Sequence, residues 1–251
     1  MRIYGLIGNK LSHSFSKKYF SEKFAKENIA NTSYELFELE SITDFPILIA
    51  KHSNLAGLNV TIPYKQSIIQ YMDELDTVAA RIGAVNVIKF LPNNKLKGYN
   101  SDYYGFKKSL QNFVSLHQAN NLVKNALILG NGGAAQAVKV ALEDLEIAYT
   151  VVSQKNTENT IPYHQIANYL PNHQLLIHTS PLGMYPNIDT SPEIPYHLLT
   201  QNHLVFDLVY NPLDTLLLQK SSLQAAKTQN GLEMLHLQAE KAWEIWNLNE
   251  Q

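Results

Sequence analysis

The chain contains no cysteine, so it has neither disulfide bonds nor thiolate metal sites. Only two arginines, Arg2 and Arg81, occur among its 251 residues, which limits how it can hold a phosphate group. The net charge is −2 and no run of like charge is present, which argues against a nucleic-acid or membrane-surface partner. No apolar stretch approaches the ~20 residues of a membrane helix, and the run Ile3–Ile7 is too short for a signal peptide. We therefore expect a cytoplasmic protein.

The apolar fraction, 45%, is that of a globular protein with a real core. Strand and helix patterns alternate along the chain, which predicts an α/β fold with a parallel sheet covered on both faces. Strands are expected at 2–8, 32–39, 55–62, 84–90, 95–99, 125–129, 148–152, 175–178 and 204–207. Helices are expected at 17–28, 45–52, 76–82, 102–113, from the turn after 130 to about 145, and at 233–248, with a loop at 115–124.

The segment Asn59-Val60-Thr61-Ile62-Pro63-Tyr64-Lys65 has the pattern of a strand end. Val60 and Ile62 are expected on the buried face, and Asn59 and Thr61 on the other. Proline then ends the strand, because it cannot donate to a sheet ladder. A lysine beside short polar side chains at the carboxyl end of a strand is placed for proton chemistry. The alternative is a solvated lysine after a strand.

A glycine-rich turn follows the expected strand 125–129. Gly130, Gly132 and Ala135 fit the dinucleotide fingerprint G-x-G-x-x-G/A, between a strand and a helix. The phosphates of a dinucleotide would bind the free N–H groups at the start of the helix. Ordinary glycine turns also occur, but this context favours a dinucleotide site.

The next strand ends in Ser153-Gln154-Lys155-Asn156-Thr157. An acidic residue here reads the ribose of NAD, and an arginine accommodates the 2′-phosphate of NADP. This chain has neither, and Lys155 supplies one positive charge without the planar grip of an arginine. The pattern predicts NADP with a weak phosphate clamp.

Several motifs, in their order along the chain, resemble those of the shikimate dehydrogenase family. They are Gly8-Asn9 with His13-Ser14-Phe15-Ser16, Asn59 to Lys65, Gly83-Ala84-Val85-Asn86, Asn100 to Gly105, Gly130 to Ala135, Thr179 to Met184, Asp207 to Pro212, and Gly231 to Gln238. The resemblance implies an N-terminal α/β substrate domain, residues 1–101 with 231–251, and a Rossmann-like NADP-binding domain, residues 102–230. It also implies the reversible reduction of 3-dehydroshikimate to shikimate by NADPH, in chorismate and aromatic amino acid biosynthesis.

The resemblance assigns roles to individual residues. Lys65 would transfer the proton, and Asp102 would orient the Lys65 side chain. The substrate would be bound by Ser14, Ser16, Asn59, Thr61, Asn86, Tyr210 and Gln238. The cofactor would be bound by Gly130, Asn131, Gly132, Gly133, Ala134, Ser153, Gln154, Lys155, Thr179, Leu208, Gly231 and Met234, with no metal ion.

Each role has a simpler structural alternative. Serines before a helix often only cap it, Asp102 can be a helix cap, and Met234 can fill the core. Asn59, Thr61, Asn86 and Gln238 can each satisfy local backbone groups, and Tyr210 can be a half-buried core residue.

The chain departs from the family where an Asn-Arg-Thr clamp is common and Ser153-Gln154-Lys155 stands instead. A quinate/shikimate dehydrogenase that uses NAD is therefore the first alternative, although the retained pair Ser14 and Ser16 favours shikimate. A binding module without catalysis is the second, and the presence of Lys65 and Asp102 argues against it. The protein is expected to be a monomer or a homodimer.

Overall fold

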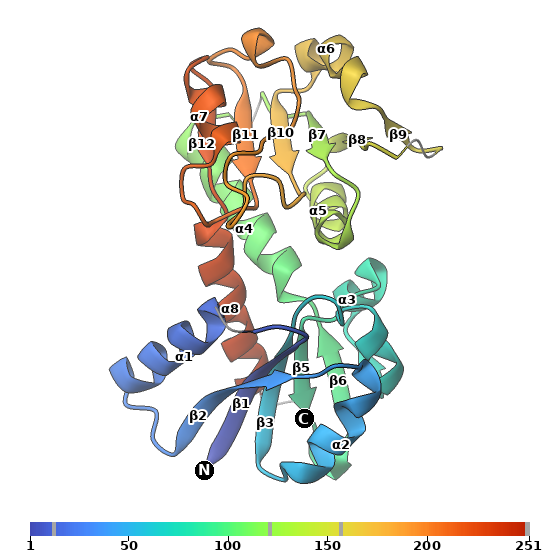
Figure 1. The fold of residues 1–251 in the computed structure, drawn as a ribbon, viewed down its shortest axis with the longest axis vertical. Coiled ribbons are helices and arrows are strands. Elements are labelled where there is room, and N and C mark those ends of the chain that lie inside the picture. Colours follow the sequence, from blue (N-terminus) through green and yellow to red (C-terminus); the bar gives the residue numbers. More distant parts are fainter. Residues whose placement is uncertain (12–13, 120–121, 156–157, 249–251) are drawn as a thin grey trace. The chain divides into compact units, whose positions relative to one another are not determined.

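The computed structural model describes residues 1–11, 14–119, 122–155 and 158–248 (Figure 1). The chain forms two compact units, Met1–Ser101 together with Ala239–Gln251, and Asp102–Gln238. The second division falls inside the last helix, α8 (Leu232–Asn247). None of the helices in the described residues has the length and hydropathy needed to cross a membrane.

The first unit is built on a mixed six-stranded sheet in the order β2-β1-β3-β5-β6-β4. Its strands are β1 (Arg2–Gly8), β2 (Thr32–Glu38), β3 (Leu55–Val60), β4 (Glu74–Leu75), β5 (Val87–Phe90) and β6 (Leu96–Tyr99). β1 pairs in parallel with β2 and β3, whereas β5 is antiparallel to both β3 and β6. The expected neighbours at 84–90 and 95–99 thus form an antiparallel pair.

Helices cover both faces of this sheet. The helices of the first unit are α1 (Phe15–Lys26), α2 (Phe45–Lys51), α3 (Thr77–Ile82) and the second half of α8. Phe20 of α1 and Trp246 of α8 belong to one buried cluster, and Phe45 of α2 belongs to the other. Trp246 packs over Gly57, where a Cβ atom would overlap its indole ring.

The second unit carries a wholly parallel six-stranded sheet in the order β12-β11-β10-β7-β8-β9. Its strands are β7 (Asn125–Leu129), β8 (Ala148–Val152), β9 (Thr160–Ile161), β10 (Leu175–His178), β11 (Leu204–Asp207) and β12 (Lys227–Gln229). Its helices are α4 (Ser101–Leu116), α5 (Gly133–Glu143), α6 (Ile166–Tyr169), α7 (Leu216–Ser222) and the start of α8. Buried clusters on each face join the sheet to its helices. The predicted fold class, two α/β units of which one is Rossmann-like with a parallel sheet, is confirmed.

The strand order of the second unit reverses between β7 and β10. From β7 the chain builds outward through β8 and β9, and from β10 it builds outward through β11 and β12. In an open α/β sheet, ligands bind at the carboxyl ends of the strands beside such a reversal. The glycine turn after β7 therefore lies where this fold places a ligand.

The structure differs from the sequence expectations mainly at element ends. The helix expected to stop at 113 continues to Leu116, into the expected loop. Helix α1 begins at Phe15, two residues early, because Ser14 caps it. Short elements were not expected at all, among them β4, β9, β12, α6, α7 and the 3₁₀ helices Ile42–Asp44, Ser67–Tyr71, Pro92–Asn94, Tyr163–Gln165, Leu170–Asn172 and Tyr196–Leu198. Elements this short contain too few side chains to show a period, and most of these lack the apolar runs that revealed the equally short strands β10 and β11.

Candidate active site

The strand that precedes Lys65 ends two residues earlier than expected. Strand β3 ends at Val60, and the N–H of Thr61 donates to the carbonyl of Ile7 at 2.9 Å. A turn follows, in which the N–H of Tyr64 donates to the carbonyl of Thr61 at 2.9 Å. The prediction that Ile62 is buried was wrong: its exposed fraction is 77%, because the turn begins before it.

Lys65 itself is held through its neighbours in the first unit. Its carbonyl accepts from the N–H of Val85 at 2.7 Å. The buried hydroxyl of Tyr64 donates to the carbonyl of Leu39 at 2.6 Å. Lys65 is half-buried, and its carbonyl ties it to the segment that contains Asn86.

Asn59 has a fixed amide orientation. The hydroxyl of Tyr34, on β2, donates to Asn59 Oδ1 at 2.7 Å, and Asn59 Nδ2 donates to the carbonyl of Asn86 at 3.2 Å. Burial raises the pKa of Tyr34 well above its ordinary value, while hydrogen bonding with Ser16 acts in the opposite direction. Tyr34 thus links two of the residues expected to bind substrate, Ser16 and Asn59.

Asn86 is fully engaged at the start of α4. Its Oδ1 accepts from the N–H of Ser101 at 2.7 Å, and its Nδ2 donates to Ser101 Oγ at 3.1 Å. Asn100 Nδ2 also donates to the carbonyl of Ala84 at 2.9 Å. These contacts fix the residue that precedes Asp102, which lies in the first turn of α4.

The serine motif has a visible structural role. Ser14 caps α1, because its Oγ accepts from the N–H of Lys17 at 3.3 Å. The capping alternative is therefore realised for Ser14, whereas Ser16 lies inside the helix and contacts Tyr34. His13 of the same motif lies outside the described residues.

The glycine turn of the second unit is open where a phosphate would sit. Gly130 has φ +118°, a backbone conformation that favours glycine, and its N–H donates to the carbonyl of Val152 at 2.9 Å. A Cβ atom added at Gly132 or Gly133 would meet nothing within 4 Å. Gly132 is the N-cap of α5, and Ala135 is fully buried against the sheet. Open space over free helix N–H groups fits the phosphates of a dinucleotide.

The end of β8 is held by two hydrogen bonds of Ser153. The N–H of Ser153 donates to the carbonyl of Ile161 at 2.9 Å, and Ser153 Oγ accepts from the N–H of Lys155 at 3.1 Å. Gln154 and Lys155 are exposed. Asn156 and Thr157 lie outside the described residues.

Leu208 and Gly231, both expected at the cofactor, are close together. A Cβ atom at Gly231 would overlap the carbonyl of Leu208, and the Gly231 N–H donates to the carbonyl of Val209 at 3.0 Å. Thr179 Oγ1 donates to the carbonyl of Gly130 at 3.2 Å, so it borders the glycine turn. Each close approach requires the small residue or short hydroxyl found there.

The residues from α8 and the loop after β11 pack as core or near-core groups. Met234 lies against the cluster that contains Phe106, which fits the core-filling alternative. Gln238 and Tyr210 are half-buried, and burial raises the pKa of Tyr210. A Cβ atom at Gly105 of α4 would overlap the backbone of Met234, so α4 and α8 touch at this glycine.

A buried polar array was not expected from the sequence. His178 and Asp207 are register partners at the carboxyl ends of β10 and β11, and both side chains are fully buried. His178 Nδ1 lies 2.9 Å from Asp207 Oδ1, and its Nε2 lies 2.6 Å from Ser180 Oγ. Asp207 Oδ2 also accepts from Thr215 Oγ1 at 2.6 Å. Because the carboxylate only accepts, Nδ1 donates to it, and in the neutral imidazole Nε2 then accepts from the serine. The sequence signal that could have revealed this array was the polar residue at the end of each of two apolar strands, His178 and Asp207.

Comparison with known proteins finds relatives both of the first unit and of the whole chain. Residues 6–88 match the model of the shikimate dehydrogenase substrate binding domain. The shikimate dehydrogenase (NADP(+)) of Clostridium beijerinckii is 40% identical, over 98% of this chain and 92% of that protein.

The chain belongs to the shikimate dehydrogenase family. Among solved structures, the chorismate mutase/shikimate 5-dehydrogenase fusion protein from Clostridium acetobutylicum matches with TM-score 0.84 and 34% identity, over 98% of this chain and 91% of that one. The shikimate 5-dehydrogenase of Listeria monocytogenes, solved with shikimate and NAD, matches with TM-score 0.85 and 25% identity, over 100% and 93%.

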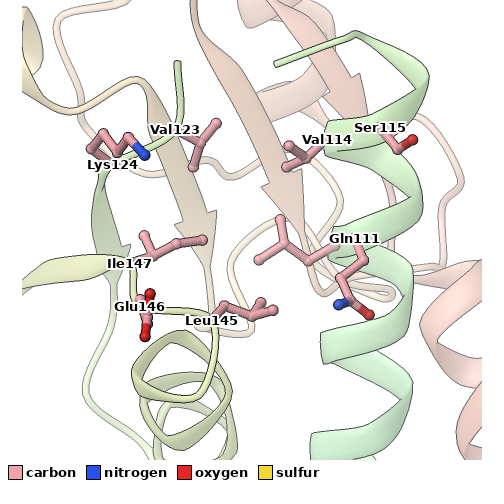
Figure 2. A pocket seen from close by; sticks show the side chains of 9 residues that line it. Gln111, Val114, Ser115, Val123, Lys124, Leu145, Glu146 and Ile147 are labelled. Atoms are coloured by element: carbon pink, nitrogen blue, oxygen red, sulfur yellow. The ribbon is translucent and has the colours of Figure 1, made fainter. Parts of the chain in front are cut away.

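One hollow of the second unit is lined by none of the expected site residues (Figure 2). It has a volume of about 410 Å³ and is lined by Leu110, Gln111, Val114, Ser115, Val123, Lys124, Leu145, Glu146 and Ile147. These residues come from α4 and from the segments that lead into β7 and β8. The hollow is therefore at the amino ends of these strands, opposite the glycine turn.

Proposed function

We propose that this chain is an NADP-dependent shikimate dehydrogenase that reversibly reduces 3-dehydroshikimate to shikimate, in chorismate and aromatic amino acid biosynthesis. The observation that carries the proposal is the 40% identity, over 98% of the chain, to a shikimate dehydrogenase (NADP(+)). The open glycine turn at the strand-order reversal supports the same conclusion, since it fits a dinucleotide.

In this proposal Lys65 transfers the proton, and Asp102 orients the Lys65 side chain. Oxidation of the alcohol releases a proton from the hydroxyl as hydride leaves the carbon, and reduction returns it. A side chain within hydrogen-bond reach of that oxygen performs this transfer as a general acid and base. NADP supplies the hydride acceptor when bound. The fixed backbone around Lys65 and the anchored start of α4 support precise placement of both groups.

The remaining assignments divide the ligands by chemistry. Ser14 and Ser16 donate to the substrate carboxylate, with Tyr210 closing the site beside it. Ring hydroxyls, which donate and accept, are held by Asn59, Thr61, Asn86 and Gln238. For Ser14 and Asn86 this adds a second role to the cap and the Ser101 contacts described above.

On the cofactor side, residues 130–134 hold the pyrophosphate. Thr179, Leu208, Gly231 and Met234 border the nicotinamide ribose and ring. Ser153, Gln154 and Lys155 face the adenosine ribose.

Lys65→Ala tests the assigned role. We expect turnover with shikimate and NADP to fall by at least about 100-fold, as for loss of a general acid or base. Shikimate should still bind, by calorimetry, within a few-fold of the unmodified affinity. Lys51→Ala, which removes an exposed lysine at the end of α2, is the control and should change neither quantity. Turnover of Lys65→Ala equal to that of the control would remove Lys65 from the mechanism.

A second candidate is a quinate/shikimate dehydrogenase with NAD use or relaxed cofactor choice. It is favoured by the lack of arginine at Ser153-Gln154-Lys155, and a relative was solved with NAD. Rates with shikimate and quinate, each with NADP and NAD, separate the two. Strong preference for NADP and shikimate supports the first candidate, and equal or better rates with NAD support the second.

Location and assembly belong to the same proposal. We propose a cytoplasmic enzyme that is a monomer or a homodimer. Cell fractionation and sedimentation equilibrium test these two points.

A further inference from the structure

The adenosine end of the cofactor site has a cation that the sequence pattern did not reveal. Lys139, on α5, donates from Nζ to Asn131 Oδ1 at 2.8 Å. Asn131 is the second residue of the glycine turn. Lys139 lies eight residues further along the chain, and its side chain points back toward the start of its helix, as helical side chains do.

The glycine turn is joined directly to the end of β8. Leu129 and Val152 are register partners, and the N–H of Gly130 donates to the carbonyl of Val152 at 2.9 Å. The next residues, Asn131 and Ser153, therefore leave neighbouring strands at the same edge of the sheet. The ammonium group of Lys139 lies at this edge, where the residue that reads the ribose 2′-position is expected.

The charge of Lys139 is only weakly compensated. Its hydrogen-bond partner is a neutral amide, and none of the ion pairs found between described residues involves it. Burial lowers the pKa of Lys139, and the more distant charge of Glu143 acts in the opposite direction. A partly desolvated cation beside a neutral group gains more from an anion than an exposed one does.

We propose that Lys139, held in place by Asn131, binds the 2′-phosphate of NADP and so sets the preference for NADP over NAD. Lys155 is a second, exposed cation at the same edge and adds a smaller part. This inference rests on the proposed function. It explains how a chain with only two arginines can bind the 2′-phosphate, for which the family commonly uses an arginine.

The test compares two probes that differ only in the 2′-phosphate, adenosine 2′,5′-bisphosphate and adenosine 5′-monophosphate. Their binding is measured by calorimetry on the full chain. We expect Lys139→Gln to weaken the bisphosphate about tenfold, the size of one charge-assisted contact, and to leave the monophosphate unchanged. Lys139→Arg should keep the difference. Lys124→Gln, an equal loss of charge at the opposite end of β7, is the matched control and should change neither affinity.

Three outcomes would overturn the inference. Equal weakening of both probes would place Lys139 at the phosphate that they share. No weakening of either would remove it from the site. Loss of the difference in Lys155→Gln, with none in Lys139→Gln, would assign the role to Lys155.

The proposed function is judged separately. It fails if the unmodified chain shows no shikimate-dependent reduction of NADP, whatever the probes show.

Discussion

At the scale of single residues, the hydroxyl of Tyr34 fixes the orientation of the Asn59 amide. It donates to Asn59 Oδ1 from a side chain with an exposed fraction of 1%. Asn59 can turn its amide either way, and this contact decides the direction, because the phenol donates and the amide oxygen accepts. One hydrogen of Asn59 Nδ2 is donated to the carbonyl of Asn86, so the second is the donor left for the substrate hydroxyl that we propose this residue binds.

Tyr34→Phe removes this hydroxyl and keeps the ring. We expect the KM for shikimate to rise about tenfold, as for the loss of one well-placed hydrogen bond, while the KM for NADP stays unchanged. Steady-state kinetics with each substrate varied in turn provide the measurement. Tyr4→Phe is the control, since Tyr4 belongs to the same buried cluster and has the same exposed fraction. If both variants behave alike, Tyr34 has no role beyond core packing.

The sequence predicts which residues belong to the site better than it predicts the side chains that contact them. It predicts Lys65, Asp102 and the glycine turn because each lies in a motif that is recognised by its residue types and their spacing. It cannot predict that Tyr34 reaches Asn59 or that Lys139 reaches Asn131, because each pair meets only after folding brings separate elements together. Ile62 was misplaced for a related reason: alternation continues in the sequence after the strand itself has ended.

At the scale of elements, β11 has a buried titratable residue beside its start and another at its end. His203 precedes the strand, and its Nδ1 accepts from the N–H of Thr200 at 3.0 Å. Asp207 ends the strand and pairs with His178. Both residues hold neighbouring segments to the strand, so the short four-residue element depends on polar contacts as well as on its apolar core.

Burial lowers the pKa of His203 below its ordinary 6.5, while hydrogen bonding with the backbone of Leu170 and Thr200 acts in the opposite direction. Because the folded state disfavours the charged imidazole, this residue's contribution to stability is complete above pH 6.5. It is lost as the pH falls from there toward the folded-state pKa. We expect the melting temperature to drop between pH 7 and pH 5, and to drop less in His203→Asn. His197→Asn, at an exposed histidine, should follow the unmodified protein. A pH profile of His203→Asn that matches the unmodified one would contradict this assignment.

The long elements were predictable and the short ones were not. Helices α5 and α8 have helical spacing, and β7 and β8 are short apolar runs on either side of the glycine turn and its helix; all four were expected within a few residues of their bounds. The two-residue strands β4 and β9 and the polar strand β12 owe their conformation to a partner strand. Strand pairing is a tertiary contact, and it has no local signature in the sequence.

At the scale of the whole molecule, the first unit is assembled from both ends of the chain. Trp246 of α8 packs against Tyr4 and Phe20, and its indole N–H donates to the carbonyl of Ile88 at 3.1 Å. Gly57 leaves the room that this ring occupies. The last helix is thus part of the core of a unit whose sheet comes from the first hundred residues.

Trp246→Ala should therefore destabilise the first unit selectively. We expect a loss of about 3–5 kcal/mol in the free energy of unfolding of that unit, as for a large aromatic removed from a core. Urea unfolding followed by amide hydrogen exchange reports each unit separately. Binding of adenosine 2′,5′-bisphosphate, which needs only the second unit, should persist under conditions where shikimate binding is lost. Trp243→Ala, at a partly buried neighbour on the same helix, should cost less. Parallel loss of both binding activities would contradict the selectivity.

The position of Trp246 also has a consequence for the order of events during synthesis. A ribosome that has made the sheet of the first unit must still make the whole parallel sheet of the second before the helix that covers Gly57 emerges. Until then the face of β1 and β3 around Tyr4 is covered in part by α1 but lacks the side chains of α8, so the rest of it is exposed to water or to a chaperone. The second unit, although it is made later, can complete its own sheet first. The nascent protein should therefore complete the sheet of its second unit before the core of its first unit is closed.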